Sequence, residues 1–209
     1  MSGIQEICDN VRARFDAMDR AREQALGISR RIIRNSGDAI KALHRGEWAQ
    51  ADQLIDETGA LVRQVNDILR DFPEIYYAGF VGNAQAEFAE ASVLRAVLKG
   101  AEIPSPGEVQ IDDAAYLHGL GDAVGELRRH ILDLIRQGRP ADGEKYLDMM
   151  DELYGQLMSF DYPDAITHGL RKKTDVARSL IERTRGDLTN ALQVSDLKGA
   201  MAKLEKEIK

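Results

Sequence analysis

Two glutamates in the middle of the chain are spaced for shared chemistry. Glu87 and Glu90 are three residues apart in a stretch of good helix formers, so a helix places both carboxylates on one face. The same face continues into Leu94 and Leu98 and becomes apolar. Two like charges on a partly buried face disfavour each other, and a bound cation would relieve that cost.

A second acidic pair follows farther along the chain. Asp122 and Glu126 are four residues apart and share a helix face that points away from the apolar stripe of their own helix. Gly119 and Gly125 lie on that face, and a glycine inside a helix costs about 1 kcal/mol relative to alanine. Because these glycines lower the stability of the helix, we expect that they are needed for the close approach of another backbone or of a ligand.

Two helices that each present two carboxylates suit a hard divalent cation. Mg²⁺ and Mn²⁺ prefer oxygen ligands, and a metal-bound water is acidic enough to attack a phosphodiester. Acidic pairs at helical spacing are also common on solvated surfaces, so spacing alone does not join the two pairs. No histidine follows a glutamate by three residues, as di-iron bundles require, and the sequence has no glycine-rich phosphate loop or serine-nucleophile motif.

The elements that must position these acids are helices. Apolar residues recur every three or four positions, and the sequence shows no alternating, strand-like runs. We therefore predict an all-α protein, an antiparallel bundle of six to seven long helices in one domain over residues 1–209. The expected helices cover residues 4–43, 48–71, 74–99, 112–137, 141–160 and 164–192, with a loop over 100–106 and a short mobile helix after Ser195.

Composition and charge limit the class of protein. Of the 209 residues, 44% are hydrophobic and 30% charged, which is typical of a globular protein. The net charge of -7 argues against a nucleic-acid partner unless basic residues gather in one stripe. The sequence has no signal pattern at its start and no apolar run near the ~20 residues of a membrane span, so we expect a soluble cytoplasmic protein without a membrane partner. The single cysteine, Cys8, lies among apolar residues and is expected to be a buried thiol.

Arginines of the first helix supply a candidate basic stripe. Arg20, Arg31 and Arg34 fall within roughly 60° of one another on a straight helix, and such a line of charge can follow a phosphate backbone. The alternative is that these arginines pair with acids on a solvated face of the same helix, namely Asp16, Asp19, Glu23 and Asp38.

Segments along most of the chain resemble the translin/Trax family. The stretch from Tyr116 to Arg129, with its Tyr-Leu entry, aspartate and Gly-Glu-Leu, is similar to the signature helix of Trax. The stretch from Glu87 to Ala91 resembles the Trax segment with two glutamates three residues apart. Further similarity follows in chain order at Ser29-Arg30, Leu43-His44-Arg45, Phe72 to Tyr77 and Leu170 to Lys173.

The resemblance implies the all-α translin fold, assembled as a hollow octamer that binds single-stranded RNA or DNA. Trax subunits carry Mg²⁺-dependent endoribonuclease activity, and their catalytic acids correspond to Glu87, Glu90 and Asp122, with Glu126 as a fourth acid beside them. The long insertion that Trax carries between these helices is replaced here by the short loop around Pro104. A compact chain with a complete acidic set suggests a homo-oligomer, while pairing with a second type of subunit stays open.

On this basis we predict an endoribonuclease that cleaves single-stranded RNA, with DNA and duplex RNA as alternative substrates. All four acids are expected to hold the metal ion, Mg²⁺ or Mn²⁺. Arginines of the first helix and its end are expected to bind the strand, namely Arg20, Arg30, Arg31, Arg34 and Arg45. Two alternatives remain: a translin-like protein that binds single-stranded RNA or DNA without cleaving it, and a helical scaffold with no nucleic-acid role.

Overall fold

Helices make up nearly all of the structure, a computed structural model that describes residues 3–207. The described residues are 86% helical and contain no strand, which confirms the all-α prediction. The long helices are α1 (Gly3–Arg45), α2 (Trp48–Ile68), α4 (Phe80–Lys99), α6 (Asp113–Arg136), α7 (Glu144–Leu157) and α9 (Leu170–Glu207). Short helical turns lie between them: α3 (Pro73–Tyr76), α5 (Pro106–Val109), the 3-10 helix η1 (Pro140–Gly143) and α8 (Asp164–Thr167). Within residues 3–207, none of these helices has the length and apolar character needed to cross a bilayer.

The described residues divide into two compact units. The first holds the chain up to Ser92 together with Pro104–Tyr116, and the second holds Val93–Ile103 and the chain from Leu117 onward. The helices α4 and α6 therefore each begin in the first unit and end in the second. The prediction of one domain over residues 1–209 stays a prediction, because the division describes compactness and not independent folding.

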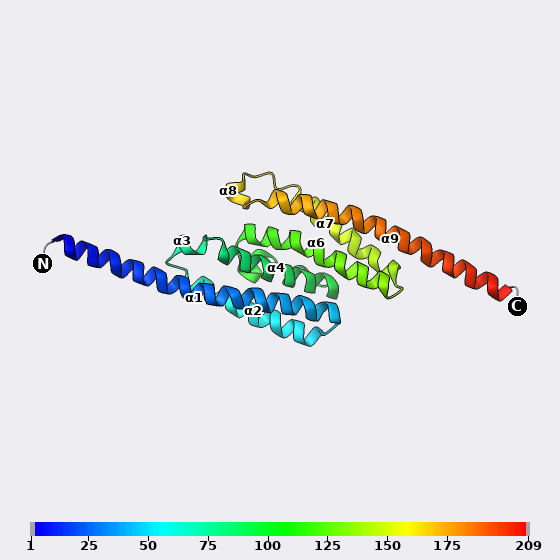
Figure 1. The fold of residues 1–209 in the computed structure, drawn as a ribbon, viewed down its shortest axis with the longest axis horizontal. Helices are drawn as coiled ribbons and strands as arrows, with labels where there is room; N and C mark the ends of the chain where they lie inside the picture. Colours follow the sequence, from blue (N-terminus) through cyan, green and yellow to red (C-terminus); the bar gives the residue numbers. More distant parts are fainter. Residues whose placement is uncertain (1–2, 208–209) are drawn as a thin grey trace. The chain divides into compact units, whose positions relative to one another are not determined.

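In the first unit, α1 and α2 form an antiparallel hairpin (Figure 1). Gly46 ends α1 with a φ of +75°, a left-handed conformation that glycine adopts without strain. Its N–H donates to the Leu43 carbonyl at 3.0 Å, and the Glu47 N–H donates to the Ala42 carbonyl at 2.9 Å, as in a Schellman-type helix end. The hairpin is closed by buried apolar residues of both helices, including Ile32, Ile40, Leu43, Ile55 and Val62.

The first turns of α1 extend beyond α2 and stay exposed (Figure 1). Buried residues of α1 begin only at Ala21, whereas Ile4, Ile7 and Phe15 keep 65%, 60% and 64% of their surface exposed. Cys8 lies in this stretch and is exposed, so the expectation of a buried thiol was wrong. The apolar periodicity around Cys8 correctly indicated a helix, but no described residue covers that helix face.

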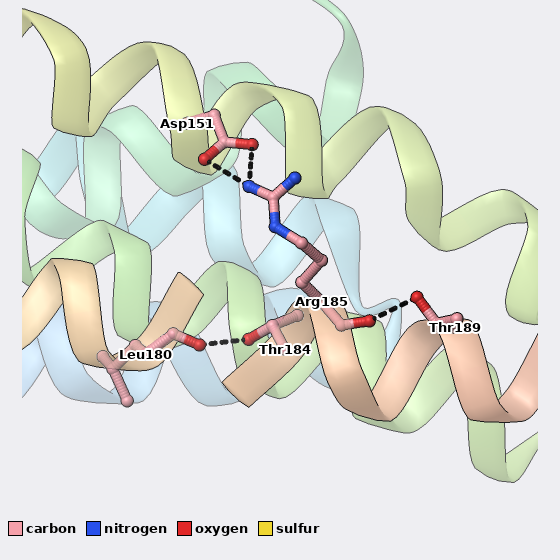
Figure 2. A network of polar contacts seen from close by, with 5 residues as sticks. All are labelled: Asp151, Leu180, Thr184, Arg185 and Thr189. Carbon is pink, nitrogen blue, oxygen red and sulfur yellow. Dashed lines mark hydrogen bonds and ion pairs between the residues drawn. The ribbon is translucent and has the colours of Figure 1, made fainter. Parts of the chain in front are cut away.

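In the second unit, α9 runs beside α7 and continues past its end (Figure 1). Figure 2 shows the polar contact between them, in which Arg185 Nη2 of α9 donates to both carboxylate oxygens of Asp151 of α7, at 2.9 and 2.8 Å. The nearby hydroxyls are satisfied within α9: Thr184 Oγ1 donates to the Leu180 carbonyl and Thr189 Oγ1 to that of Arg185. The Arg185–Asp151 pair is exposed, so the buried apolar residues of both helices, including Leu153 and Leu157 of α7 and Ile181 and Leu188 of α9, account for most of the packing of α9 on α7.

Two helices that were expected to be continuous are broken. The helix expected over 74–99 splits into α3 and α4, and Gly79 between them has a φ of +82°. The helix expected over 164–192 splits into α8 and α9 at His168 and Gly169, whose φ angles are +50° and +85°. A left-handed residue ends an α-helix, and a 3.6-residue apolar period does not reveal it.

Smaller differences concern helix ends and the central loop. The tail after Ser195 is no separate helix but the continuation of α9 to Glu207. The loop expected over 100–106 is followed directly by α5, which starts with a capping box of Ser105 and Glu108. The helix expected over 141–160 is shorter, since η1 takes its first residues and α7 ends at Leu157.

Candidate functional site

The first acidic pair, Glu87 and Glu90, lies on α4 in the first unit. Both side chains are partly buried, and the residues between and after them, Phe88, Ala89 and Ala91, are buried. A Cβ atom added to Gly59 of α2 would lie 3.4 Å from the Phe88 ring, the distance of a van der Waals contact, so the ring packs directly on α2. Apolar packing of α4 on α2 therefore fixes the helix that carries the two glutamates.

Gln85 anchors α4 two residues before the first acid. It is 2% exposed, and its Nε2 donates to the Tyr76 hydroxyl at 2.9 Å, while its Oε1 accepts from the Asp112 N–H at 3.3 Å. Burial raises the pKa of Tyr76, and the hydrogen bond from Gln85 lowers it by less, so the phenol is neutral at neutral pH. Through Gln85, α4 is tied to α3 and to the residue before α6. The sequence analysis missed this residue, although a glutamine inside a run of buried small residues is a recognisable signal.

The second acidic pair, Asp122 and Glu126, lies on α6 in the second unit. Both are partly buried, with 32% and 24% of their side-chain surfaces exposed. Lys173 Nζ of α9 lies 2.5 Å from Asp122 Oδ1 and 2.7 Å from Oδ2. Arg129 Nη1 lies 3.5 Å from Glu126 Oε2. Each acid of α6 thus has a basic side chain beside it, and Lys173 is a residue to which the sequence analysis gave no role.

The glycines of α6 explain how Lys173 reaches Asp122. A Cβ atom on Gly121 would lie 3.1 Å from Lys173 Cβ, which is closer than real Cβ atoms normally approach. The close approach that was expected at Gly125 is an ordinary contact, since a Cβ atom there would be 3.8 Å from Leu180 Cδ1. The tight crossing of α6 and α9 is therefore at Gly121, directly before Asp122.

His118 holds the segment that leads into α9. It lies one turn before Asp122 on α6, and its Nε2 is 2.8 Å from the Thr167 carbonyl oxygen at the end of α8. Leu170, at the start of α9, is 2% exposed and anchors the next turn. These contacts position the start of α9, and with it Lys173, against α6.

The donor chemistry of the four acids fits a hard divalent cation, because all four offer carboxylate oxygens and all four are partly buried. Within residues 3–207, however, no three His, Cys, Asp or Glu side chains gather closely enough to hold a metal ion. The two pairs belong to different units, so the structure describes each pair by itself. The metal site built from Glu87, Glu90, Asp122 and Glu126 stays a prediction.

The arginines predicted to bind nucleic acid lie along α1 or at its end, and all are exposed. Arg45 donates to Glu47 at 2.6 Å, a hydrogen bond that raises the pKa of the Arg45 guanidinium. Pairing on the solvated face also occurs at Arg22 with Glu23. In the part of the chain that the structure describes, no ion pair forms at the remaining predicted positions, Arg20, Arg30, Arg31 and Arg34. Their positive charge faces solvent and is not used by the fold.

Comparison with known proteins places the chain among its relatives. No family model matches it. It is 33% identical to the uncharacterized protein MJ0175 of Methanocaldococcus jannaschii over 178 residues, which cover 84% of this chain and 78% of that protein.

Solved structures give the fold and the family. The chain is 34% identical to AfC3PO, with a TM-score of 0.83 over 90% of this chain and 97% of that one, and one of the two AfC3PO structures is a complex with duplex RNA. NeC3PO in its apo form matches with a TM-score of 0.80 at 23% identity, which shows the same fold. Both are C3PO-type proteins of the translin/Trax family. At this identity over nearly the whole length of AfC3PO, the chain belongs to the translin/Trax family.

Proposed function

We propose that the chain is a metal-dependent endoribonuclease that binds single-stranded RNA and cleaves its phosphodiester bonds. Mg²⁺ or Mn²⁺ would be held by Glu87, Glu90 and Asp122, with Glu126 assisting. The main support is that this relative of AfC3PO, a protein solved with duplex RNA, carries four partly buried acids as two same-face pairs on two helices. Carboxylates of like charge on a partly buried face disfavour each other, which makes the two pairs candidates for binding a cation.

Each group at the proposed site would have a separate role in the cleavage reaction. A bound Mg²⁺ supplies an acidic water and offsets negative charge on the phosphate oxygens. The carboxylates of Glu87 and Glu90 would hold the ion, and one of these carboxylates would also accept the proton of the attacking water. The rigid support of α4 by Gln85 and Phe88 keeps the two glutamates in place, as positioning in catalysis requires.

RNA binding is proposed to use the exposed arginines of α1. The guanidinium groups of Arg20, Arg31 and Arg34 lie along one side of the helix without ion-pair partners among the described residues, and phosphate oxygens suit them. Contacts to the backbone give little sequence preference and a strong dependence on salt. Duplex RNA and single-stranded DNA carry the same phosphates and are the alternative ligands to compare.

A second candidate function is RNA binding without cleavage. Asp122 already has a cation beside it, because Lys173 contacts both of its carboxylate oxygens. If that ion pair persisted in the working protein, Asp122 would be a structural acid. The acids would then stabilise the helices, and the protein would only hold the strand.

The decisive experiment is incubation of the purified protein with end-labelled single-stranded RNA and Mg²⁺. We expect cleavage that EDTA stops and that Glu90→Gln and Asp122→Asn each reduce by roughly 100-fold. Asp133→Asn is the matched control, since Asp133 lies on the same helix as Asp122 but forms an exposed pair with Arg136 at 2.9 Å. RNA that stays intact with Mg²⁺ or Mn²⁺ but is still bound would establish the binding function instead. Cleavage that survives both substitutions would show that the acids are wrongly assigned.

We further propose that the chain forms a homo-oligomer, with an octamer as the expected size. The end of α9 exposes Val194, Leu197, Met201 and Leu204, each more than half exposed and spaced three, four and three residues apart. This is the a/d spacing of a coiled-coil seam, which is stable only when another helix covers it. The variant Leu197→Glu/Met201→Glu should lower the mass measured by light scattering, whereas Lys198→Glu, an exposed charge change between them, should not.

A further inference from the structure

Lys173 contacts both carboxylate oxygens of Asp122, one of the acids proposed to hold the metal ion. Its ammonium lies 2.5 Å from Oδ1 and 2.7 Å from Oδ2, so one positive group bridges both oxygens. Charge-assisted contacts of this length are strong hydrogen bonds. The two residues are 51 positions apart, so tertiary packing of α9 on α6 creates the contact.

The surrounding residues build this contact. Gly121 lets the lysine stem cross α6, since a Cβ atom there would meet Lys173 Cβ at 3.1 Å and Cγ at 3.9 Å. On either side of Lys173 along α9, Leu170 and Thr174 are buried at 2% and 5% exposure, which fixes the rotation of the helix. Helix packing therefore directs the start of the Lys173 side chain toward Asp122, within reach of its ammonium.

A second ion pair on α6 shows what an ordinary surface contact looks like. Asp133 pairs with Arg136 three residues later on the same helix, and the arginine is 79% exposed. Lys173 is 38% exposed and comes from another helix. Local surface pairs contribute little and exchange freely with water, whereas the Asp122 pair is held by packing.

We propose that Lys173 is a tethered cation that holds Asp122 while no metal ion is bound and competes with the ion for the same two oxygens. This inference rests on the proposed function, because it concerns the metal at that site. An ammonium that bridges both carboxylate oxygens would repel a divalent ion binding to the same carboxylate. The lysine, on its flexible four-carbon stem, must therefore move away from Asp122 for the ion to bind there.

The test measures Mn²⁺ binding without RNA, by the electron paramagnetic resonance signal of free Mn²⁺. Lys173→Met keeps an unbranched stem over Gly121 and removes the charge. We expect its Mn²⁺ dissociation constant to fall about five-fold, which corresponds to about 1 kcal/mol. Lys172→Met is the matched control, because it removes the same charge from an exposed neighbour, and its dissociation constant should stay within about two-fold of wild type.

Two further variants test whether a change in Mn²⁺ affinity depends on the charge of Lys173 and on the carboxylate of Asp122. Lys173→Arg retains the charge and should not bind Mn²⁺ more tightly than wild type, even if the helix packing adjusts. Asp122→Asn should weaken Mn²⁺ binding in both the wild-type and the Lys173→Met backgrounds. Circular dichroism of each variant confirms that the helices are intact before binding is compared.

Different failures separate the two proposals. If Mn²⁺ binds wild type and Lys173→Met equally, or binds Lys173→Met more weakly, the competition is refuted while the metal-dependent function stands. If no variant binds Mn²⁺ at millimolar concentration, the proposed metal-dependent function is refuted and the competition with it. If Lys172→Met and Lys173→Met both bind Mn²⁺ more tightly, the gain comes from the loss of any positive charge near the site. That result would also refute the competition.

Discussion

The two acidic pairs have similar composition and spacing, but their surroundings differ. On α6, Asp122 has Lys173 beside it and Glu126 has Arg129. On α4, the positions three and four residues from Glu87 and Glu90 hold no basic residue, so this pair lacks the local basic neighbour at helical spacing that Arg129 gives Glu126. Equal spacing along a helix therefore does not give two acidic pairs equal surroundings.

The largest expected effect compares one acid from each pair. Glu90→Gln should lower kcat/KM for RNA cleavage by roughly 100-fold, because Glu90 is one of the three acids proposed to hold the metal ion. Glu126→Gln should lower it by roughly 10-fold, since Arg129 already neutralises part of its charge. Single-turnover cleavage at saturating Mg²⁺ measures both. Equal losses would show that Glu126 is as important for cleavage as Glu90.

The next effect compares the two ion pairs of α6 in metal-free protein. A double-mutant cycle with Asp122→Asn and Lys173→Met should give a coupling free energy of about 1 kcal/mol in urea unfolding. The cycle with Glu126→Gln and Arg129→Met should give about 0.3 kcal/mol, because that contact is 3.5 Å long and Arg129 is 53% exposed. A Glu126–Arg129 coupling as large as the other would show that interhelical packing adds nothing.

The glycines beside the α6 acids give a smaller effect. Gly125→Ala should stabilise the protein by about 0.5–1 kcal/mol, since alanine favours the helix and its Cβ would make an ordinary contact with Leu180. Gly121→Ala should show little or none of this gain, because its Cβ would press on the Lys173 stem at 3.1 Å. Thermal unfolding of both variants provides the measurement. A full gain at Gly121 would mean that the crossing of α6 and α9 is loose.

The smallest effect concerns the support of α4 at alkaline pH. Burial raises the pKa of Tyr76, which contacts Gln85, and also that of Tyr116. A raised folded-state pKa means that the stabilisation is complete below the ordinary tyrosine pKa of about 10 and is lost as pH rises through the folded-state value. Tyr76→Phe should therefore flatten the fall in unfolding free energy above pH 10 by a few tenths of a kcal/mol. The control is Tyr77→Phe, at a tyrosine that is 66% exposed, and it should leave the slope unchanged.

Helix content and the main helices could be predicted because apolar periodicity and Gly or Pro breaks are local signals. The end of α1 at Arg45 and the start of α6 after Asp112 lie within two residues of expectation. The breaks at Gly79 and at His168–Gly169 were missed, because a glycine is also tolerated inside a helix and does not by itself show that the helix ends there. Cys8 was misplaced for another reason: periodicity shows that a helix has an apolar face, but not whether anything covers it.

By itself the sequence determined the helical class, the two same-face acidic pairs and the resemblance to a family. Each of these depends on residues that are neighbours in the chain or on a pattern of residue types. Only the tertiary structure decided that Lys173 reaches Asp122 across Gly121 and that Gln85 joins α4 to α3. Such contacts link residues far apart in the chain or in separate helices, and the packing of whole helix faces sets their distances. The environment of an acid, and with it the acid's need for a metal ion, is therefore a tertiary property.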